Sequence, residues 1–109
     1  MAENITVYRG ISYNKTFVAI DASGAVVNVT GFTPTAEVRV HGRSSPLVLN
    51  LSPTLGTTPA NGEIDIALLP AATDIARGEY TWDLLLSDGT NKLRIAGGTF
   101  TVEETTTTP

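Results

Sequence analysis

Acidic side chains, one histidine and two adjacent serines are the residues whose types could perform chemistry in this chain. Residues 78–91, GEYTWDLLLSDGTN, place Glu79 and Asp83 on either side of the only tryptophan. Two carboxylates could act as general acid and base, but only with a partner at the right spacing. Strand alternation puts Tyr80 and Trp82 on one face and Asp83 on the other, so periodicity supplies no such partner. We interpret this segment as a folding element without a catalytic residue.

The other candidate residues are equally isolated. His41 stands at the end of a predicted strand, where a solvated side chain is expected. Ser44 and Ser45 lack the G-x-S-x-G elbow of hydrolases, and Gly97-Gly98 precedes a strand, whereas a phosphate-binding loop precedes a helix. The absence of cysteine excludes disulfides and thiolate ligands. We predict no catalytic residue, no metal site and no cofactor, and therefore a protein that is not an enzyme.

Length and charge bound the remaining classes. The chain has 109 residues, of which 41% are hydrophobic, as expected for one domain with one core. Its net charge of −4 offers no basic stripe for phosphates, so we expect no nucleic-acid partner. No apolar run approaches the ~20 residues of a membrane-spanning helix. The polar start MAENITVYRG lacks a secretory signal, so we expect no membrane association and retention in the producing cytoplasm.

Alternation of apolar and polar residues, broken by turns about every ten positions, predicts an all-β antiparallel sandwich or barrel. One short helical segment is expected at 70–78, about two turns long, with Gly78 at its cap. Lys15 shares parity with inward residues, which indicates an irregular or edge strand. The loop at 52–62 is too rich in proline and glycine for a central strand. The predicted strands cover 5–8, 12–20, 26–29, 35–41, 47–51, 63–68, 80–86 and 91–103.

Parity also predicts the core. The side chains expected to be most important inside are Tyr80, Trp82, Leu84 and Phe100. An earlier strand should turn Ala36, Val38 and Val40 inward.

The last strand changes parity along its length. Leu93 and Ile95 are inward on odd numbers, whereas Phe100 is inward on an even number. We predict a β-bulge at Gly97-Gly98, where a glycine can take a positive φ. Lys92 and Arg94 should then lie beside Asp83 as cross-strand charges.

A G-x-Y-x-W motif at Gly78, Tyr80 and Trp82 resembles the tyrosine corner that opens strand F of immunoglobulin-like sandwiches. A wider resemblance covers residues 9 to 103. Its motifs are an early RG, the turn DASG followed by TGFT, an AEVRV strand, GEIDIALLPAATDIARGEYTWDLLLSDG and a closing GGTFTVE. In this order they resemble the small immunoglobulin-like virion proteins of tailed bacteriophages, including the amino-terminal domain of baseplate upper proteins.

The resemblance implies a non-enzymatic structural protein of the virion, in the tail or baseplate or as a fibre adaptor, that docks through strand edges, loops and terminal arms. Two alternatives stay open: a capsid decoration or cement protein, and a carbohydrate-binding or adhesin-type recognition module. A recognition module needs exposed aromatic rings, for which Tyr8, Tyr13 and Phe32 are the candidates. The fold implied is an antiparallel immunoglobulin-like β-sandwich.

We divide the chain into a β-sandwich domain, 1–103, and an extended Thr-rich C-terminal arm, 104–109. The ending VEETTTTP cannot bury enough apolar surface to order itself, so we expect the arm to add to a neighbouring chain. The expected partners are other virion structural proteins, in multiple copies within a symmetric assembly. The expected location is the virion, assembled in the cytoplasm of a host bacterium. The residues predicted to contact partners are Glu103, Glu104, Thr105, Thr106, Thr107, Thr108 and Pro109.

Overall fold

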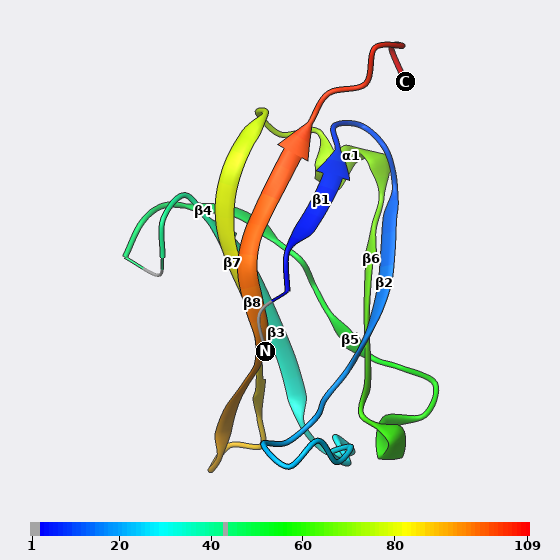
Figure 1. The fold of residues 1–109 in the computed structure, drawn as a ribbon, viewed down its shortest axis with the longest axis vertical. Helices are drawn as coiled ribbons and strands as arrows, with labels where there is room; N and C mark the ends of the chain where they lie inside the picture. The colour runs from blue at the N-terminus through cyan, green and yellow to red at the C-terminus, as the bar shows by residue number, and fades with distance from the viewer. Residues whose placement is uncertain (1–2, 43) are drawn as a thin grey trace.

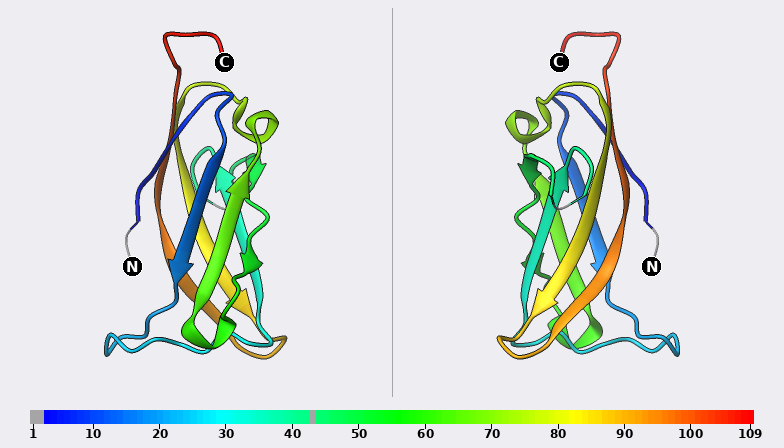
Figure 2. Two further views of the ribbon diagram at one scale, coloured as in Figure 1. Left: turned by 90° about the vertical axis from the view of Figure 1, so that its right-hand side faces the viewer. Right: turned by 90° about the vertical axis from the view of Figure 1, so that its left-hand side faces the viewer.

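The computed structural model describes residues 3–42 and 44–109, and within these the chain forms two β-sheets packed face to face (Figures 1 and 2). Residues 1, 2 and 43, which belong to the predicted 1–103 domain, lie outside the described residues. One sheet has the order β1-β8-β7-β3-β4 and the other β2-β6-β5. The strands are β1 (Ile5–Tyr8), β2 (Tyr13–Val18), β3 (Thr33–Arg39), β4 (Leu47–Asn50), β5 (Thr54–Leu55), β6 (Glu63–Leu68), β7 (Gly78–Ser87) and β8 (Lys92–Glu103).

The pairing confirms the predicted all-β sandwich. Every strand pair is antiparallel except β1 and β8, which run parallel from Ile5 opposite Phe100 to Tyr8 opposite Glu103. The strand order is that of an immunoglobulin-like sandwich, in which the third, sixth and seventh strands share one sheet and the second, fourth and fifth the other. Here β3, β7 and β8 correspond to the third, sixth and seventh strands, and β2, β5 and β6 to the second, fourth and fifth. The first strand, β1, differs because it pairs with β8 in the larger sheet, and β4 adds an edge strand to that sheet.

Alternate side chains of both sheets meet in one apolar core. Trp82, Leu84 and Phe100 are buried there, and the Phe17 ring of the smaller sheet lies 5.4 Å from the Trp82 ring between centroids. The indole Nε1 of Trp82 donates to the backbone oxygen of Glu3 at 2.9 Å. This hydrogen bond satisfies the polar group of the indole, so the buried Trp82 side chain has no unpaired donor. It also connects the core to the segment that precedes β1.

Tyr80 differs from its predicted place in the core, because it is only partly buried. Its ring packs against the core, and its hydroxyl donates to the backbone oxygen of Ala76 at 2.6 Å. A hydroxyl that returns to the backbone a few residues upstream is the geometry of a tyrosine corner. The hydroxyl must reach this surface acceptor, so the side chain cannot bury itself completely.

The predicted helical segment is shorter than expected. The helix α1 (Pro70–Thr73) makes a single turn, and Gly78 begins β7 instead of capping it. The Thr73 hydroxyl, fully buried, bonds the backbone oxygen of Ile11 at 2.8 Å and ties this turn to the connection between β1 and β2. A second short helical turn, η1 (Pro59–Asn61), lies in the segment predicted to be only a loop. The edge strand β5 lies there as well, outside the sheet centre.

The predicted strand at 26–29 is wrong, because only an isolated bridge joins Ile20 to Val26. The Asp21 carboxylate accepts hydrogen bonds from Ser23 and from the Ala25 backbone, which closes a tight turn there. Those hydrogen bonds, first the one from the Ser23 side chain, lower the pKa of Asp21. An Asx-type turn is an alternative to strand pairing, and in this segment the turn forms instead of a strand.

The bulge in β8 lies at Ile95 and not at Gly97-Gly98. Leu84 pairs with Ala96 and the next residue, Leu85, pairs with Arg94, so Ile95 is the extra residue. The parity change was therefore predicted correctly, but its position was wrong by two to three residues.

Gly97 and Gly98 pair regularly with β7. Glycine is needed at both positions because other atoms occupy the space that a side chain would take. A Cβ at Gly98 would lie 2.7 Å from the Glu3 backbone oxygen, and one at Gly97 would lie 2.9 Å from the Cβ of Asp83. Two other inward predictions also fail: Val40 lies beyond the end of β3 and is 49% exposed, and Leu93 near the start of β8 is 38% exposed. No helix in residues 3–42 or 44–109 could cross a membrane.

Candidate interaction site

The C-terminal arm turns back over one end of its own sandwich (Figure 1). Glu103 is the last residue of β8, and the arm begins at Glu104. Arg9 Nη1 lies 3.1 Å from the Glu104 carboxylate, and Arg9 Nε lies 2.9 Å from the Asp74 carboxylate. Pro109 closes the arm on Gly10, where an added Cβ would meet its ring at 2.9 Å. The arm and the end of the sandwich line an open pocket of about 530 Å³.

These contacts hold the arm weakly. The Arg9, Asp74 and Glu104 side chains are 44%, 62% and 49% exposed, and exposed ion pairs contribute about 0–1 kcal/mol. The hydrogen bond to Asp74 is the main reason why the pKa of Arg9 is raised, so this guanidinium stays charged. Of the predicted partner-contact residues in the arm, Thr105 is partly buried and the other five are exposed. The arm therefore lies on the surface and is not packed into the core.

Removing the arm should leave the stability of the sandwich nearly unchanged. We expect the chain without 104–109 to lose less than about 1 kcal/mol of unfolding free energy, because only exposed contacts disappear. For a domain of this length that is a shift of the thermal midpoint below roughly 8 °C, measurable by scanning calorimetry. A loss of several kcal/mol would show that the arm belongs to the folded domain.

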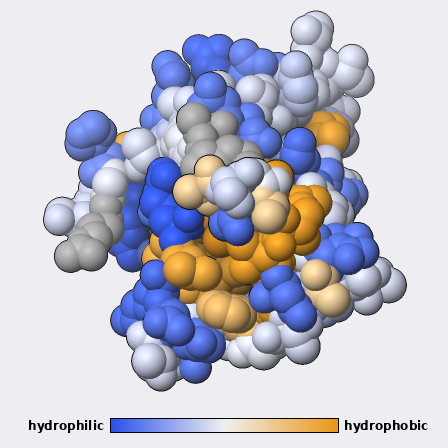
Figure 3. Space-filling model, turned by 60° about the horizontal axis from the view of Figure 1, so that its bottom comes forward, coloured by the Kyte–Doolittle hydropathy of each residue, from blue (hydrophilic) through white to orange (hydrophobic). Residues whose placement is uncertain are grey.

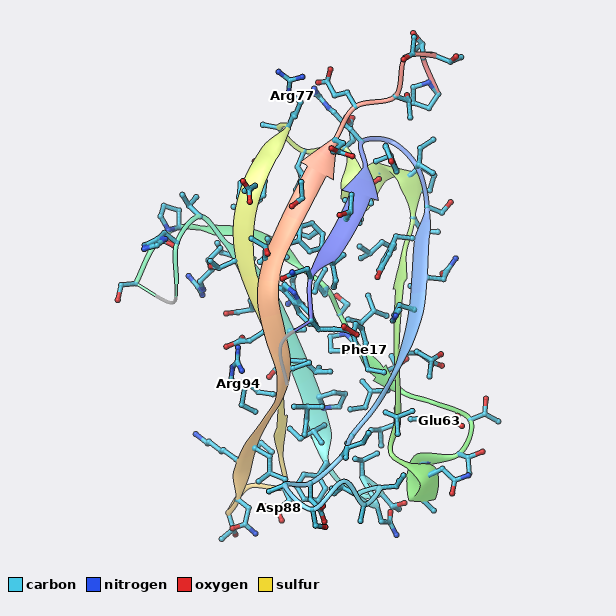
Figure 4. The ribbon with its side chains drawn as sticks, viewed as in Figure 1. Phe17, Glu63, Arg77, Asp88 and Arg94 are labelled. Atoms are coloured by element: carbon cyan, nitrogen blue, oxygen red, sulfur yellow. The ribbon has the colours of Figure 1, made fainter. Side chains whose placement is uncertain are left out.

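The acidic candidates of the sequence have structural partners. Asp83 lies 3.8 Å from Arg94 across β7 and β8, on the outer face where Figure 4 shows Arg94. Asp88 closes the β7–β8 turn, and hydrogen bonds from the Asn91 and Thr90 backbones lower its pKa. His41 is exposed. In the part of the chain that the structure describes, no group of three or more metal-ligating side chains comes together.

The outer face of the larger sheet holds a depression of about 540 Å³. Its charged lining consists of two ion pairs, Glu37 with Arg39 at 2.9 Å and Asp83 with Arg94 at 3.8 Å. Among the described residues, each charged side chain that lines the depression has a neighbour of opposite charge.

Replacing Asp83 by Asn should therefore have a small effect. We expect a loss of less than about 1 kcal/mol, because the carboxylate is half exposed and pairs at 3.8 Å across the strands. Urea titration measures it. A loss above about 2 kcal/mol would mean that Asp83 supports more than one surface ion pair.

Aromatic rings do not form a flat exposed platform on the described residues. Tyr8 is 47% exposed, whereas Tyr13 and Phe32 pack partly against the core. The one close ring pair there, Phe17 with Trp82, is buried. The structure therefore gives no support to a carbohydrate-type recognition surface.

A groove between the two sheets is a surface that the sequence reasoning missed. It measures about 210 Å³ and runs between β2 and the first half of β8. Its lining includes Lys15, Phe17, Val18 and Ile20 on one side and Ile95 on the other. The anomalous inward parity of Lys15 was the available signal, since a charge on the inner face indicates that the sandwich is open there.

No protein-family description matches this chain, and no curated protein matches it. Among solved structures, the chain is similar to a family 123 glycoside hydrolase from Clostridium perfringens, with 14% identity and a TM-score of 0.37. The match covers 95% of this chain and 23% of that chain, so this chain spans less than a quarter of the enzyme's length.

This neighbour corrects one expectation. The prediction that the chain is not an enzyme is contradicted, because the similar structure belongs to a hydrolase, and we withdraw that exclusion. At a TM-score of 0.37 the likeness carries no argument for an activity of this chain either.

Proposed function

We propose that this chain is a structural component of a tailed-bacteriophage virion, in the tail or baseplate or as a fibre adaptor, that docks onto other virion proteins through strand edges, loops and its C-terminal arm. Capsid decoration is the alternative position in the particle. The observation that carries the proposal is the arm, a polar β-branched segment that lies outside the sandwich, with a half-exposed ion pair to Arg9 and every residue but Thr105 exposed.

The arm's chemistry supports an assembly role. Threonine favours extended backbone, while its hydroxyl keeps the segment soluble before it docks. Releasing the arm from Arg9 costs little, because that ion pair is half exposed. An extended segment with free backbone groups can then add to a sheet edge of a neighbour.

The sandwich supplies the complementary surfaces. Its smaller sheet ends in β2 on one side and in the two-residue strand β5 on the other, and its larger sheet ends in the four-residue strand β4. Very short edge strands resist uncontrolled pairing. The six-residue β2 is the longest open edge of the smaller sheet, which makes specific strand addition possible there.

The test measures the chain in purified particles. A phage that carries the chain without 104–109 should give particles that contain at least tenfold less of this chain than wild-type particles do. We expect this because loss of the arm removes one docking contact and the raised effective concentration that this contact provides. The matched control is Arg9→Gln, which leaves the arm unchanged but removes the ion pair between Arg9 and Glu104, and this variant should be incorporated normally. Quantitative mass spectrometry of the particles provides the ratio. Truncated chain at the wild-type ratio, or no chain in wild-type particles, would refute the proposal.

A further inference from the structure

Among the described residues, no strand pairs with one of the two sides of β2. This strand pairs with β6 from Tyr13 to Val18, and the preceding strand β1 pairs with β8 instead of covering the other side. Backbone groups alternate between the two sides of a strand. Ala19 donates to Gly62 at the end of β6, so the even-numbered residues direct their N–H and C=O groups to the open side. These residues are Asn14, Thr16 and Val18.

The open edge borders the groove between the sheets. Val18 and Ile20 are 38% and 42% exposed there, and Ile95 forms the opposite wall. Figure 4 shows Phe17 extending from β2 into the space between the sheets, and Figure 3 shows a contiguous hydrophobic area, in orange, on the surface seen from below. An added strand would pair with the open edge and remove this apolar surface from water at the same time.

The charges of the groove indicate what the added strand must carry. Lys15 lines it, with Nζ 5.7 Å from the Phe17 ring centroid, and no ion pair joins this ammonium to a carboxylate in residues 3–42 and 44–109. Glu3 also lines the groove, and its charge acts on Tyr13, whose pKa is raised mainly by burial and further by this carboxylate. A carboxylate in the added strand would therefore be favoured near Lys15 and disfavoured near Glu3.

We propose that the C-terminal arm of a second copy of this chain adds as a strand to the open edge of β2, covering the groove, with Glu104 of the arm beside Lys15. The arm spans 104–109 and is as long as β2, and Glu104 is its first residue. Pro109 has no N–H and ends the pairing. This inference rests on the proposed function, because it names the site that receives the arm.

The arm of the same chain cannot fill the groove. The arm leaves β8 at Glu103, whereas the groove reaches only Ala96, seven residues earlier, which is about 23 Å along the strand. The six arm residues span about 20 Å when extended. Between these points, the edge of β8 from Phe100 to Glu103 is already paired with β1. The groove is thus accessible to another copy's arm and not to its own.

Cysteine cross-linking tests the contact, because the chain has no cysteine of its own. Val18→Cys and Thr106→Cys are made in separate preparations of the full chain, mixed and oxidised mildly. We expect a disulfide-linked dimer with one chain of each kind. The control replaces Val18→Cys by Leu85→Cys, because Leu85 is 39% exposed, as Val18 is at 38%, but lies on the outer face of β7. Docking raises the effective concentration of the Thr106→Cys thiol near residue 18, so we expect about tenfold more cross-linked product with Val18→Cys than with Leu85→Cys.

Charge reversal tests the partner of Lys15. Lys15→Glu in the Val18→Cys chain should reduce the cross-linked yield several-fold, and Glu104→Lys in the Thr106→Cys chain should restore it. Circular dichroism of each variant verifies folding, which an exposed edge residue should not disturb.

The outcomes separate the two proposals. Equal cross-linking at Val18 and Leu85, a yield that ignores Lys15→Glu, or no association of the full chain up to about 1 mM would overturn this receiving site. If arm deletion still prevents incorporation into particles, the proposed function stands with another receiving surface. If deletion has no effect there, the proposed function fails whatever the cross-linking shows.

Discussion

Trp82→Ala should destabilise the domain by about 3–5 kcal/mol, the cost of truncating a large buried aromatic side chain. Trp82 is 3% exposed, its ring packs against Phe17 at 5.4 Å, and its indole bonds Glu3 at 2.9 Å. The substitution removes the contact between the sheets and leaves the Glu3 oxygen without its partner. Against a total stability of roughly 5–15 kcal/mol, this is enough to unfold a marginal domain.

Urea titration measures the loss. Trp82→Phe serves as the control, because it keeps a ring beside Phe17 and removes mainly the hydrogen bond. It should cost about 1–3 kcal/mol and remain folded if Trp82→Ala does not. A loss below about 1 kcal/mol for Trp82→Ala would mean that the packing of the two sheets does not depend on this side chain.

Gly62→Ala should cost about 2–4 kcal/mol, far more than alanine costs at an ordinary surface position. Gly62 has φ 77° at the end of η1, a conformation that strains other residues by about 1–2 kcal/mol. An added Cβ would also lie 2.9 Å from the Val27 backbone oxygen and 3.0 Å from that of Ala19. Because the obstacle is backbone, the bond from Val27 to Ala19 must shift to make room.

Gly89→Ala separates the two causes. Gly89 has φ 94°, but a Cβ there meets no atom within 4 Å, so this variant shows the conformational strain alone. Its cost should be about 1–2 kcal/mol. Equal midpoints for the two variants, measured by thermal or urea denaturation, would contradict the proposed backbone obstruction at Gly62.

The sheets were predictable from the sequence where alternation is strict. The run EIDIAL turns Ile64, Ile66 and Leu68 inward, as expected, because a strand paired on both sides must follow its pleat. The prediction failed at 26–29, where an apolar run meets the Asp21 turn, since a local hydrogen bond between side chain and backbone outweighs alternation. The position of the bulge was also predicted wrongly. A glycine can be required because the backbone needs a positive φ or because no side chain fits, and the sequence alone does not distinguish these two reasons.

The places of the arm and of the groove were predictable only in part. The composition of residues 104–109 predicts a separate segment, but its contact with Arg9 depends on where the connection between β1 and β2 lies in three dimensions. The groove was missed because it forms only if β1 pairs with β8 instead of with β2. Alternation describes which face a residue takes, and it does not say which strand is the neighbour.

The parallel pairing of β1 and β8 has a mechanical consequence. The first strand begins at the opposite end of this pair from the point where the last strand ends, so a force that pulls the two ends of the chain apart runs along both strands. Four residue pairs, from Ile5 opposite Phe100 to Tyr8 opposite Glu103, are then loaded in shear together instead of opening one after another. Just before β1, the Glu3 backbone oxygen accepts a hydrogen bond from Trp82, and the Asn4 side chain accepts one from the Thr99 hydroxyl. The domain should resist tension along its chain much better than a hairpin that can be unzipped.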